Sequence, residues 1–272
     1  MPARDTAVVV GAPGAIAESI AALLAADGHP VASVGFRFAA RAGDGRAFDT
    51  PRDGEGWRSL IAEIASAQGP PLVLVDVASF PAGYGQPDGA HSYVGEVLAR
   101  AEASVSAARP LMAQARSGSV VLVGLPMGSE AVVGIPAAGA LAGALPGLVR
   151  GLAVEMGDDG IRVNLVSPGL IRLARINESQ RPGDGFGIVP LRRPGTDERA
   201  GSPVDVAAAV AFLASADAGY ITGTQLVVDG GLSPCRNSRA SAFWEDGATD
   251  AFERSAGLAV VATASPQPAP EH

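Results

Sequence analysis

The sequence predicts an α/β fold, a doubly wound parallel sheet flanked by helices in a single domain. Three observations indicate this class. Short apolar runs alternate with helix-length segments, as expected for a parallel sheet that is covered on both faces. A turn of glycine and proline joins the first apolar run directly to an alanine-rich segment. The length of 272 residues suits one domain with a large buried core.

The first part of the chain predicts three strands and one helix. Thr6–Val10 is rich in valine, as buried strands are. Ala15–Ala26 repeats apolar residues at helical spacing, and Gly28 is expected to end this helix. Val31–Phe36 predicts the second strand. The short segment Arg46–Asp49 predicts a weak third strand.

The middle of the chain predicts two helices and two central strands. Trp57–Ala67 has apolar residues at helical spacing and predicts a helix. Leu72–Val75 is a continuous apolar run, entered through two prolines, which is typical of a buried strand. Glu96–Ala115 is alanine-rich and predicts a long helix. Ser119–Val123 is valine-rich and predicts the fifth strand.

The last part predicts two more strand and helix pairs. Gly139–Gly157 and Val204–Leu213 have helical length and periodicity, and Arg162–Val166 and Gln225–Val228 are strand-like apolar runs. Beyond residue 235 the composition becomes polar and then proline-rich. We therefore expect a domain at residues 1–235 and an extension at residues 236–272 with a mobile end.

Charge and composition exclude several function classes. The formal net charge is −8 and no basic cluster is present, which argues against partners such as nucleic acid or a membrane surface. No run approaches the length of a membrane span, and one cysteine, Cys235, allows no internal disulfide. We therefore expect a cytoplasmic protein. The three histidines are far apart in sequence, so no metal site is expected.

The chain contains no lysine, because all 20 of its basic residues are arginines. This excludes a Schiff-base lysine, a phosphate-loop lysine and a lysine that supports a catalytic tyrosine. A coding bias that replaces surface lysines with arginines explains part of the count. It does not explain the loss of a catalytic lysine, since the always-charged guanidinium is not a substitute for an ammonium group of adjustable pKa.

Four segments, in order over residues 6 to 231, resemble the short-chain dehydrogenase/reductase family. They are VVVGAPGAIAESIA, LVLVDVAS, GLAVEMGDDGIRVNLVSPGLI and YITGTQLVVDGG. The first is similar to the family's cofactor loop, the second to its fourth-strand Asn-Asn-Ala-Gly motif, and the last two to its sixth strand and final turn. The resemblance implies a Rossmann-like fold that binds NAD(P) and transfers hydride to or from a carbonyl or alcohol.

The residues that perform this reaction in the family are missing here. The family uses a tyrosine as acid/base, a lysine four residues later, a serine about thirteen residues earlier and an asparagine in the preceding long helix. Aligned on VRGLAVEMGDDGIRVN, those positions fall on Ala138, Ala142, Leu125 and Val97, respectively. We therefore expect no catalytic residue from the family's set.

The cofactor loop is altered as well. The family's three glycine positions hold Gly11, Ala15 and Ala17, and a methyl group at Ala15 stands where the backbone approaches the phosphates. If nucleotide binding is retained, the resemblance implies contacts from Gly11, Ile16, Asp49 and Ala78. We expect no bound cofactor, with NAD(P) as the alternative.

Three functions fit these residues. The first is a catalytically inactive subunit, or pseudoenzyme, that forms a homo-oligomer or pairs with an active member of the family, since the family assembles through the two long helices. The second is a repurposed biosynthetic enzyme that uses Asp76, Tyr84 or the arginines of the segment between Arg172 and Gly201. The third is a nucleotide or metabolite sensor.

Overall fold

The described residues form one parallel sheet between two layers of helices. The computed structural model describes residues 5–35, 46–78, 89–125, 136–169, 171–172, 191 and 200–233. In this part of the chain the strand order is β3-β2-β1-β4-β5-β6-β7. The predicted fold class is therefore confirmed. The strands are β1 (Thr6–Val10), β2 (Val31–Val34), β3 (Arg46–Phe48), β4 (Pro71–Val77), β5 (Gly118–Val123), β6 (Ile161–Pro168) and β7 (Gln225–Val228).

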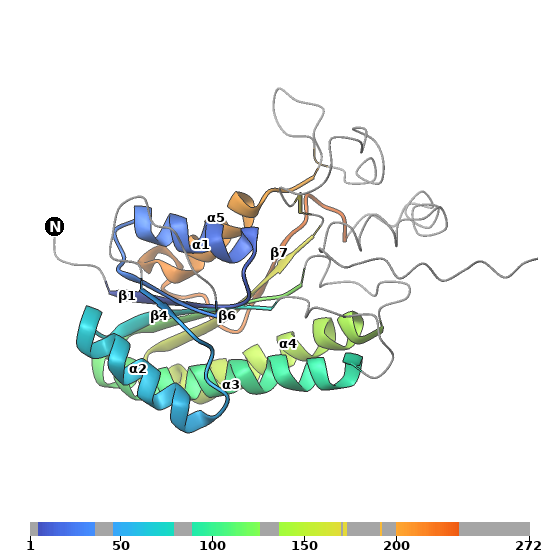
Figure 1. The fold of residues 1–272 in the computed structure, drawn as a ribbon. Helices are drawn as coiled ribbons and strands as arrows, with labels where there is room; N and C mark the ends of the chain where they lie inside the picture. The colour runs from blue at the N-terminus through green and yellow to red at the C-terminus, as the bar shows by residue number, and fades with distance from the viewer. Residues whose placement is uncertain are drawn as a thin grey trace, which may run out of the picture.

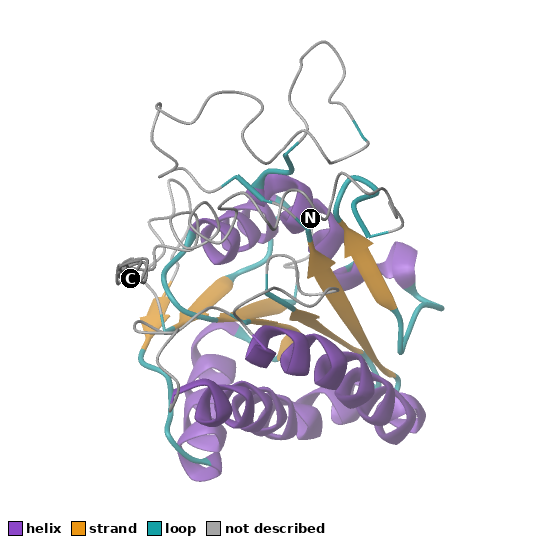
Figure 2. Cartoon of the chain, turned by 90° about the vertical axis from the view of Figure 1, so that its right-hand side faces the viewer, coloured by secondary structure: helices purple, strands orange, loops and turns teal. Residues whose placement is uncertain are grey.

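Helices cover both faces of the sheet. Helices α2, α3 and α4 lie on one face and α1 and α5 lie on the other, where they pack against each other (Figure 1). Figure 2 shows the same two layers from the side, with the strands between them. The helices are α1 (Ala15–Ala26), α2 (Gly54–Gln68), α3 (Gly89–Ala115), α4 (Pro136–Met156) and α5 (Pro203–Ala214), with short 3-10 helices η1 (Gly157–Asp159) and η3 (Ala216–Ala218).

Several predicted boundaries differ from the structure, and the differences at α3 and β2 have an identifiable physical cause. Helix α3 begins at Gly89, seven residues before the predicted Glu96, because Tyr93 and Val97 pack into the core although the first turns are rich in weak helix formers. Strand β2 ends at Val34, since Gly35 has a φ of +86° and turns the chain.

The direction of winding reverses between β1 and β4. Strands β2 and β3 extend the sheet from one side of β1, whereas β4 to β7 extend it from the other. Ligands of doubly wound folds bind at the carboxyl ends of the strands at such a switch point. The residues that meet there are therefore the first place to look for function.

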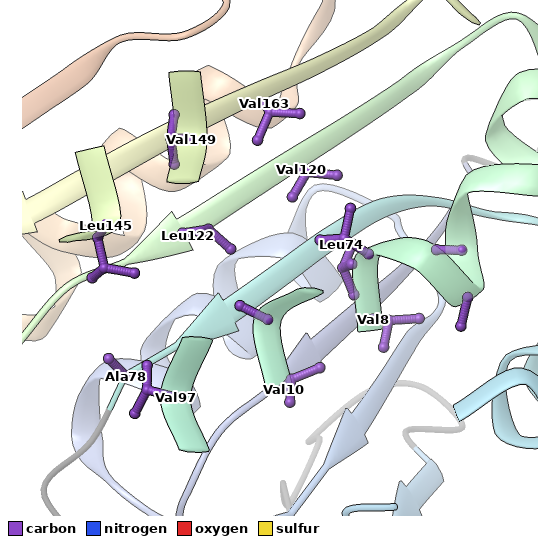
Figure 3. Packing of buried hydrophobic residues seen from close by; sticks show 14 of the residues in the cluster. Val8, Val10, Leu74, Ala78, Val97, Val120, Leu122, Leu145, Val149 and Val163 are labelled. Carbon is purple, nitrogen blue, oxygen red and sulfur yellow. The ribbon is translucent and has the colours of Figure 1, made fainter. Parts of the chain in front are cut away.

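Valine, leucine and isoleucine side chains fill the space on both sides of the sheet. Alternate residues of each strand face opposite helical layers, so that Val8, Leu74 and Leu122 face α3 and α4 (Figure 3), whereas Val9 and Val75 face α1 and α5. Continuous burial of the central strands explains why they appear in the sequence as unbroken apolar runs.

Among the residues that the structure describes, one helix is long and apolar enough to cross a membrane by length and composition alone. It spans Ala137–Asp159, so the expectation that no run reaches this length is wrong. In the structure this segment is α4 with η1, and α4 packs on β6 and α3 as one of the layers of the α/β domain. The apolar residues of this helix are therefore explained by its packing against the sheet and the neighbouring helix.

Candidate functional site

The turn between β1 and α1 leaves the start of the helix open. Gly11 ends β1, and a Cβ added to it would lie 3.3 Å from the Cβ and carbonyl oxygen of Val77. Gly14 precedes α1 and offers no side-chain cap, and the nearest atom to an added Cβ there would be the carbonyl oxygen of Ala12 at 3.9 Å. The first N–H groups of a helix have no intrahelical acceptor, so this end favours an anion. Glu18, also in the first turn, opposes a second negative charge.

A second glycine completes this turn. Gly35 follows β2 at a positive φ, and a Cβ on it would overlap the carbonyl oxygen of Gly11 and lie 2.6 Å from Oγ1 of Thr50. The structure thus brings together the carboxyl ends of β1 and β2 and the segment after β3. Thr50 and Gly35 were not predicted as site residues. The available signal was a glycine directly after the second apolar run.

The four predicted cofactor residues occupy different environments. Gly11 lies in the turn, and Asp49 is exposed beside Thr50. Ile16 is buried with the α1 and α5 layer, whereas Ala78 is buried on the α3 side of the sheet. The structure therefore brings Gly11 and the neighbour of Asp49 to one place. Ile16 and Ala78 instead pack in the hydrophobic clusters on opposite faces of the sheet.

Three of the four positions that the family resemblance assigns to catalytic groups are part of the apolar core. Leu125 is 1% exposed, and Val97 and Ala138 are also buried, all in one cluster with the side chains under β4 and β5. Figure 3 shows Val97 on α3 close to Ala78 at the end of β4. Ala142 is half-buried on α4. These four side chains supply no hydrogen-bond donor and no titratable group.

An ion pair lies beside this apolar cluster. The side chain of Asp76 on β4 is 2% exposed, and Arg100 of α3 binds it through two nitrogens, Nε to Oδ2 at 3.2 Å and Nη2 to Oδ1 at 2.6 Å. Burial lowers the pKa of Arg100, but the charge and hydrogen bonds of Asp76 raise it overall. Asp76 was predicted as a possible catalytic carboxylate. In the structure both of its oxygens accept hydrogen bonds from Arg100.

Arg100 was not predicted as a site residue. Its signal in the sequence is an arginine three positions after Val97 and one before Ala101, next to the face of α3 that packs on the sheet. A charged residue at such a position needs a buried partner of opposite charge.

Asp229 fixes the turn that follows β7. Its carboxylate accepts hydrogen bonds from the N–H groups of Gly231 at 2.8 Å and Ser233 at 2.6 Å. The same residue contacts Gly169, where an added Cβ would overlap Asp229. Burial raises the pKa of Asp229, but the hydrogen bonds from Ser233, Gly231 and Leu232 lower it overall below its ordinary value.

This lowered pKa predicts a loss of stability in acid. The folded state binds the Asp229 proton less readily than the unfolded chain, so the stabilisation is complete above the unfolded pKa and is lost as pH falls through the folded pKa. In Asp229→Asn we expect a melting temperature below that of the wild type at pH 7, and the difference narrows below about pH 4. Thermal unfolding from pH 7 to pH 3 measures it. A difference in melting temperature that stays the same from pH 7 to pH 3 would contradict the role of the ionised Asp229 carboxylate in stability.

Several predicted residues lie outside the described part of the chain. These are Tyr84 and the arginines between Arg172 and Gly201, together with the extension at residues 236–272. Within the described ranges, no three His, Cys, Asp or Glu side chains lie close enough to hold a metal ion.

Comparisons with known proteins identify the family. Residues 99–233 match a family model described as enoyl-(acyl carrier protein) reductase. The chain is 35% identical over 130 residues to an oxidoreductase of Sarocladium schorii, covering 48% of this chain and 51% of the relative. It is 37% identical over 123 residues to a 3-oxoacyl-(acyl-carrier-protein) reductase of Haemophilus influenzae, covering 44% and 48%. The chain belongs to the short-chain dehydrogenase/reductase family.

The comparisons with curated relatives cover only part of each protein. The matches span about half the length of these two relatives. A third relative, a glucose 1-dehydrogenase of Gluconobacter oxydans, is 39% identical over 95 residues, 34% of each chain. Dehydrogenase/reductase family members usually bind NAD(P), so the expectation of no cofactor is not supported, and the alternative, NAD(P), is compatible with the family.

The residues present fit the pyrophosphate of a dinucleotide better than the hydride-transferring end. The open first turn of α1 and the close approach at Gly11 suit a pyrophosphate, although Ala15 replaces a glycine there. When bound, NAD(P) supplies hydride transfer in this family. The positions that would move the proton, Leu125, Ala138 and Ala142, are apolar here.

Proposed function

We propose that this chain is a catalytically inactive subunit that pairs with, and supports, an active short-chain dehydrogenase/reductase in the cytoplasm. One observation carries the proposal: three of the four catalytic positions, Val97, Leu125 and Ala138, are buried in an apolar core, and the chain has no lysine. Coding bias accounts for missing lysines. It does not account for the replacement of a serine, a tyrosine and an asparagine by apolar residues.

The outer face of α4 supports an assembly role. Its exposed positions are the small or apolar residues Ala140, Gly143, Gly147, Gly151 and Val154 and the charged residues Arg150 and Glu155, and Val154 is 85% exposed. A Cβ added to any of the three glycines would meet nothing within 4 Å, so packing within this chain does not require them. Small residues let two helices approach closely.

The spacing of this face also suits a helix that crosses it antiparallel. The small or apolar positions are symmetric about Gly147, so Gly143 would face the position equivalent to Gly151, and Ala140 the position equivalent to Val154. An active relative that presents a similar helix would bury Val154 over a small residue. A second copy of this chain is the alternative partner for this face of α4, and the experiment below distinguishes the two.

The proposal predicts that bulk at the centre of α4 prevents pairing. We expect Gly147→Leu to weaken the complex with a lysine-bearing homologue at least about tenfold, since the added side chain holds the helices apart. Leucine is a better helix former than glycine by up to about 1 kcal/mol, so the fold is retained. Co-expression, co-purification and titration measure the affinity.

The matched control is Ala22→Leu, an exposed position of α1 on the opposite face of the sheet. We expect it to bind like the wild type. Oxidation of NADPH by the purified chain alone, or failure to form any complex while the chain is stable alone, would contradict the proposal. Association only with itself would favour the homo-oligomer.

The competing readings have less support. A repurposed enzyme that uses Asp76 as its base must first separate this carboxylate from Arg100. A nucleotide sensor would bind its ligand at the uncapped first turn of α1. Calorimetric titration with NAD(H) and NADP(H) tests the sensor, and binding without turnover would favour it.

A further inference from the structure

The Asp76–Arg100 ion pair lies at the switch point of the sheet. Asp76 is paired in register with Val10, the last residue of β1, so it lies where β1 and β4 end side by side. Arg100 reaches this point from α3, the helix that follows β4. The pair therefore joins a helical layer to the place where doubly wound folds bind ligands.

The contacts of Arg100 extend beyond the carboxylate. Nη2 also donates to the carbonyl oxygen of Val77 at 3.1 Å. The same carbonyl lies 3.3 Å from the position of a Cβ on Gly11. One guanidinium thus binds two consecutive residues at the end of β4, and the second of them packs against the turn between β1 and α1.

We propose that Asp76 and Arg100 form an internal clamp that holds the ends of β1 and β4 on α3 independently of any nucleotide. This inference rests on the proposed function, because a subunit that supports a partner without turnover must keep its fold whether or not the crevice is filled. Arg100 donates hydrogen bonds to the carboxylate of Asp76 and to the carbonyl oxygen of Val77, so these groups at the end of β4 have partners within the chain.

The unequal exposure of the two side chains predicts unequal effects of removing them. Asp76 is 2% exposed, so in Arg100→Met an almost fully buried carboxylate loses its partner. Arg100 is 21% exposed, so in Asp76→Asn the guanidinium still reaches water. The double variant Asp76→Asn/Arg100→Met buries no charge. It therefore lacks the unpaired carboxylate that makes Arg100→Met the less stable single variant.

The test is equilibrium unfolding of the full chain in urea. We expect Arg100→Met to raise the unfolding constant about 100-fold and Asp76→Asn about tenfold, with the double variant below Arg100→Met alone. If Arg100→Met does not fold, Arg100→Lys, which keeps a charge but not the two-nitrogen contact, replaces it in the cycle. Single effects that simply multiply in the double variant overturn the clamp.

Arg109→Met is the matched control. Arg109 is also an α3 arginine with two carboxylate partners, Glu155 and Asp159, but that cluster is more exposed. We expect less than about a threefold change. An effect as large as that of Arg100→Met would overturn the argument from burial.

Two further readouts separate a clamp from general stability. Hydrogen exchange in Arg100→Met should rise more in residues 6–17 and 71–78 than in α5. Arg100→Met should raise the unfolding constant by the same factor with and without saturating NADH or NADPH, and a factor that is tenfold or more smaller with nucleotide overturns independence from nucleotide. The proposed function is judged separately, because pairing with a homologue is measured on the wild type.

Discussion

Gly35→Ala is expected to destabilise the protein by about 3 kcal/mol or more, lowering the melting temperature by roughly 10 °C. Two causes act together. The residue has a φ of +86°, which residues with a Cβ rarely adopt, and the added Cβ would overlap the carbonyl oxygen of Gly11 and lie 2.6 Å from Oγ1 of Thr50. Relief requires backbone movement at the ends of both β1 and β2. Thermal and urea unfolding measure the loss.

Gly14→Ala is the matched control, since it adds the same methyl group to the same region. The φ of Gly14 is 176°, which is extended backbone, and the nearest atom to an added Cβ is the carbonyl oxygen of Ala12 at 3.9 Å. We expect a change within about 1 kcal/mol. Equal effects of the two substitutions would mean that Gly35 is not fixed by its contact with Gly11.

Leu125→Ser, which introduces the serine that the family resemblance implies for this position, is expected to cost about 4 kcal/mol. Leu125 is 1% exposed and packs in the core with Ala138 and Val97. The change leaves a cavity and places a hydroxyl group among apolar side chains. We also expect no oxidation of NAD(P)H, because neither the tyrosine nor the lysine is present.

Ala142→Ser controls for the hydroxyl group itself. Ala142 is half-buried on α4, so its serine reaches water, and we expect a loss of no more than about 1 kcal/mol. If Leu125→Ser unfolds at the same urea concentration as the wild type, position 125 is not a core position and the site is more open than we infer.

The alternation of apolar runs and helical segments was sufficient to predict the fold. Strands β1 and β7 and helix α1 have the predicted bounds, because each ends at a change of polarity or at a turn residue. The start of α3 was placed too late, since Gly89–Gly95 has little intrinsic helix propensity and tertiary packing of Tyr93 outweighs it.

The candidate site was predictable only in part. Alignment of sequence patterns places Ala138 and Leu125 at catalytic positions, and the structure adds that both are buried in the core. The partnership of Asp76 with Arg100 joins residues 24 positions apart and depends on how α3 packs on β4. The overlap of Gly35 with Gly11 likewise depends on pairing of β2 with β1. The residues Arg100 and Gly35 stand out in the sequence, but the partner that each contacts is set by the fold.

The ion pair between Asp76 and Arg100 also constrains how these two positions can change in evolution. A change to asparagine at position 76 leaves an arginine without its carboxylate, and a change at position 100 leaves a buried aspartate without its cation. Each single step passes through a less stable protein, so the two positions must change together. Descendants of this chain are therefore expected either to keep both residues or to replace both.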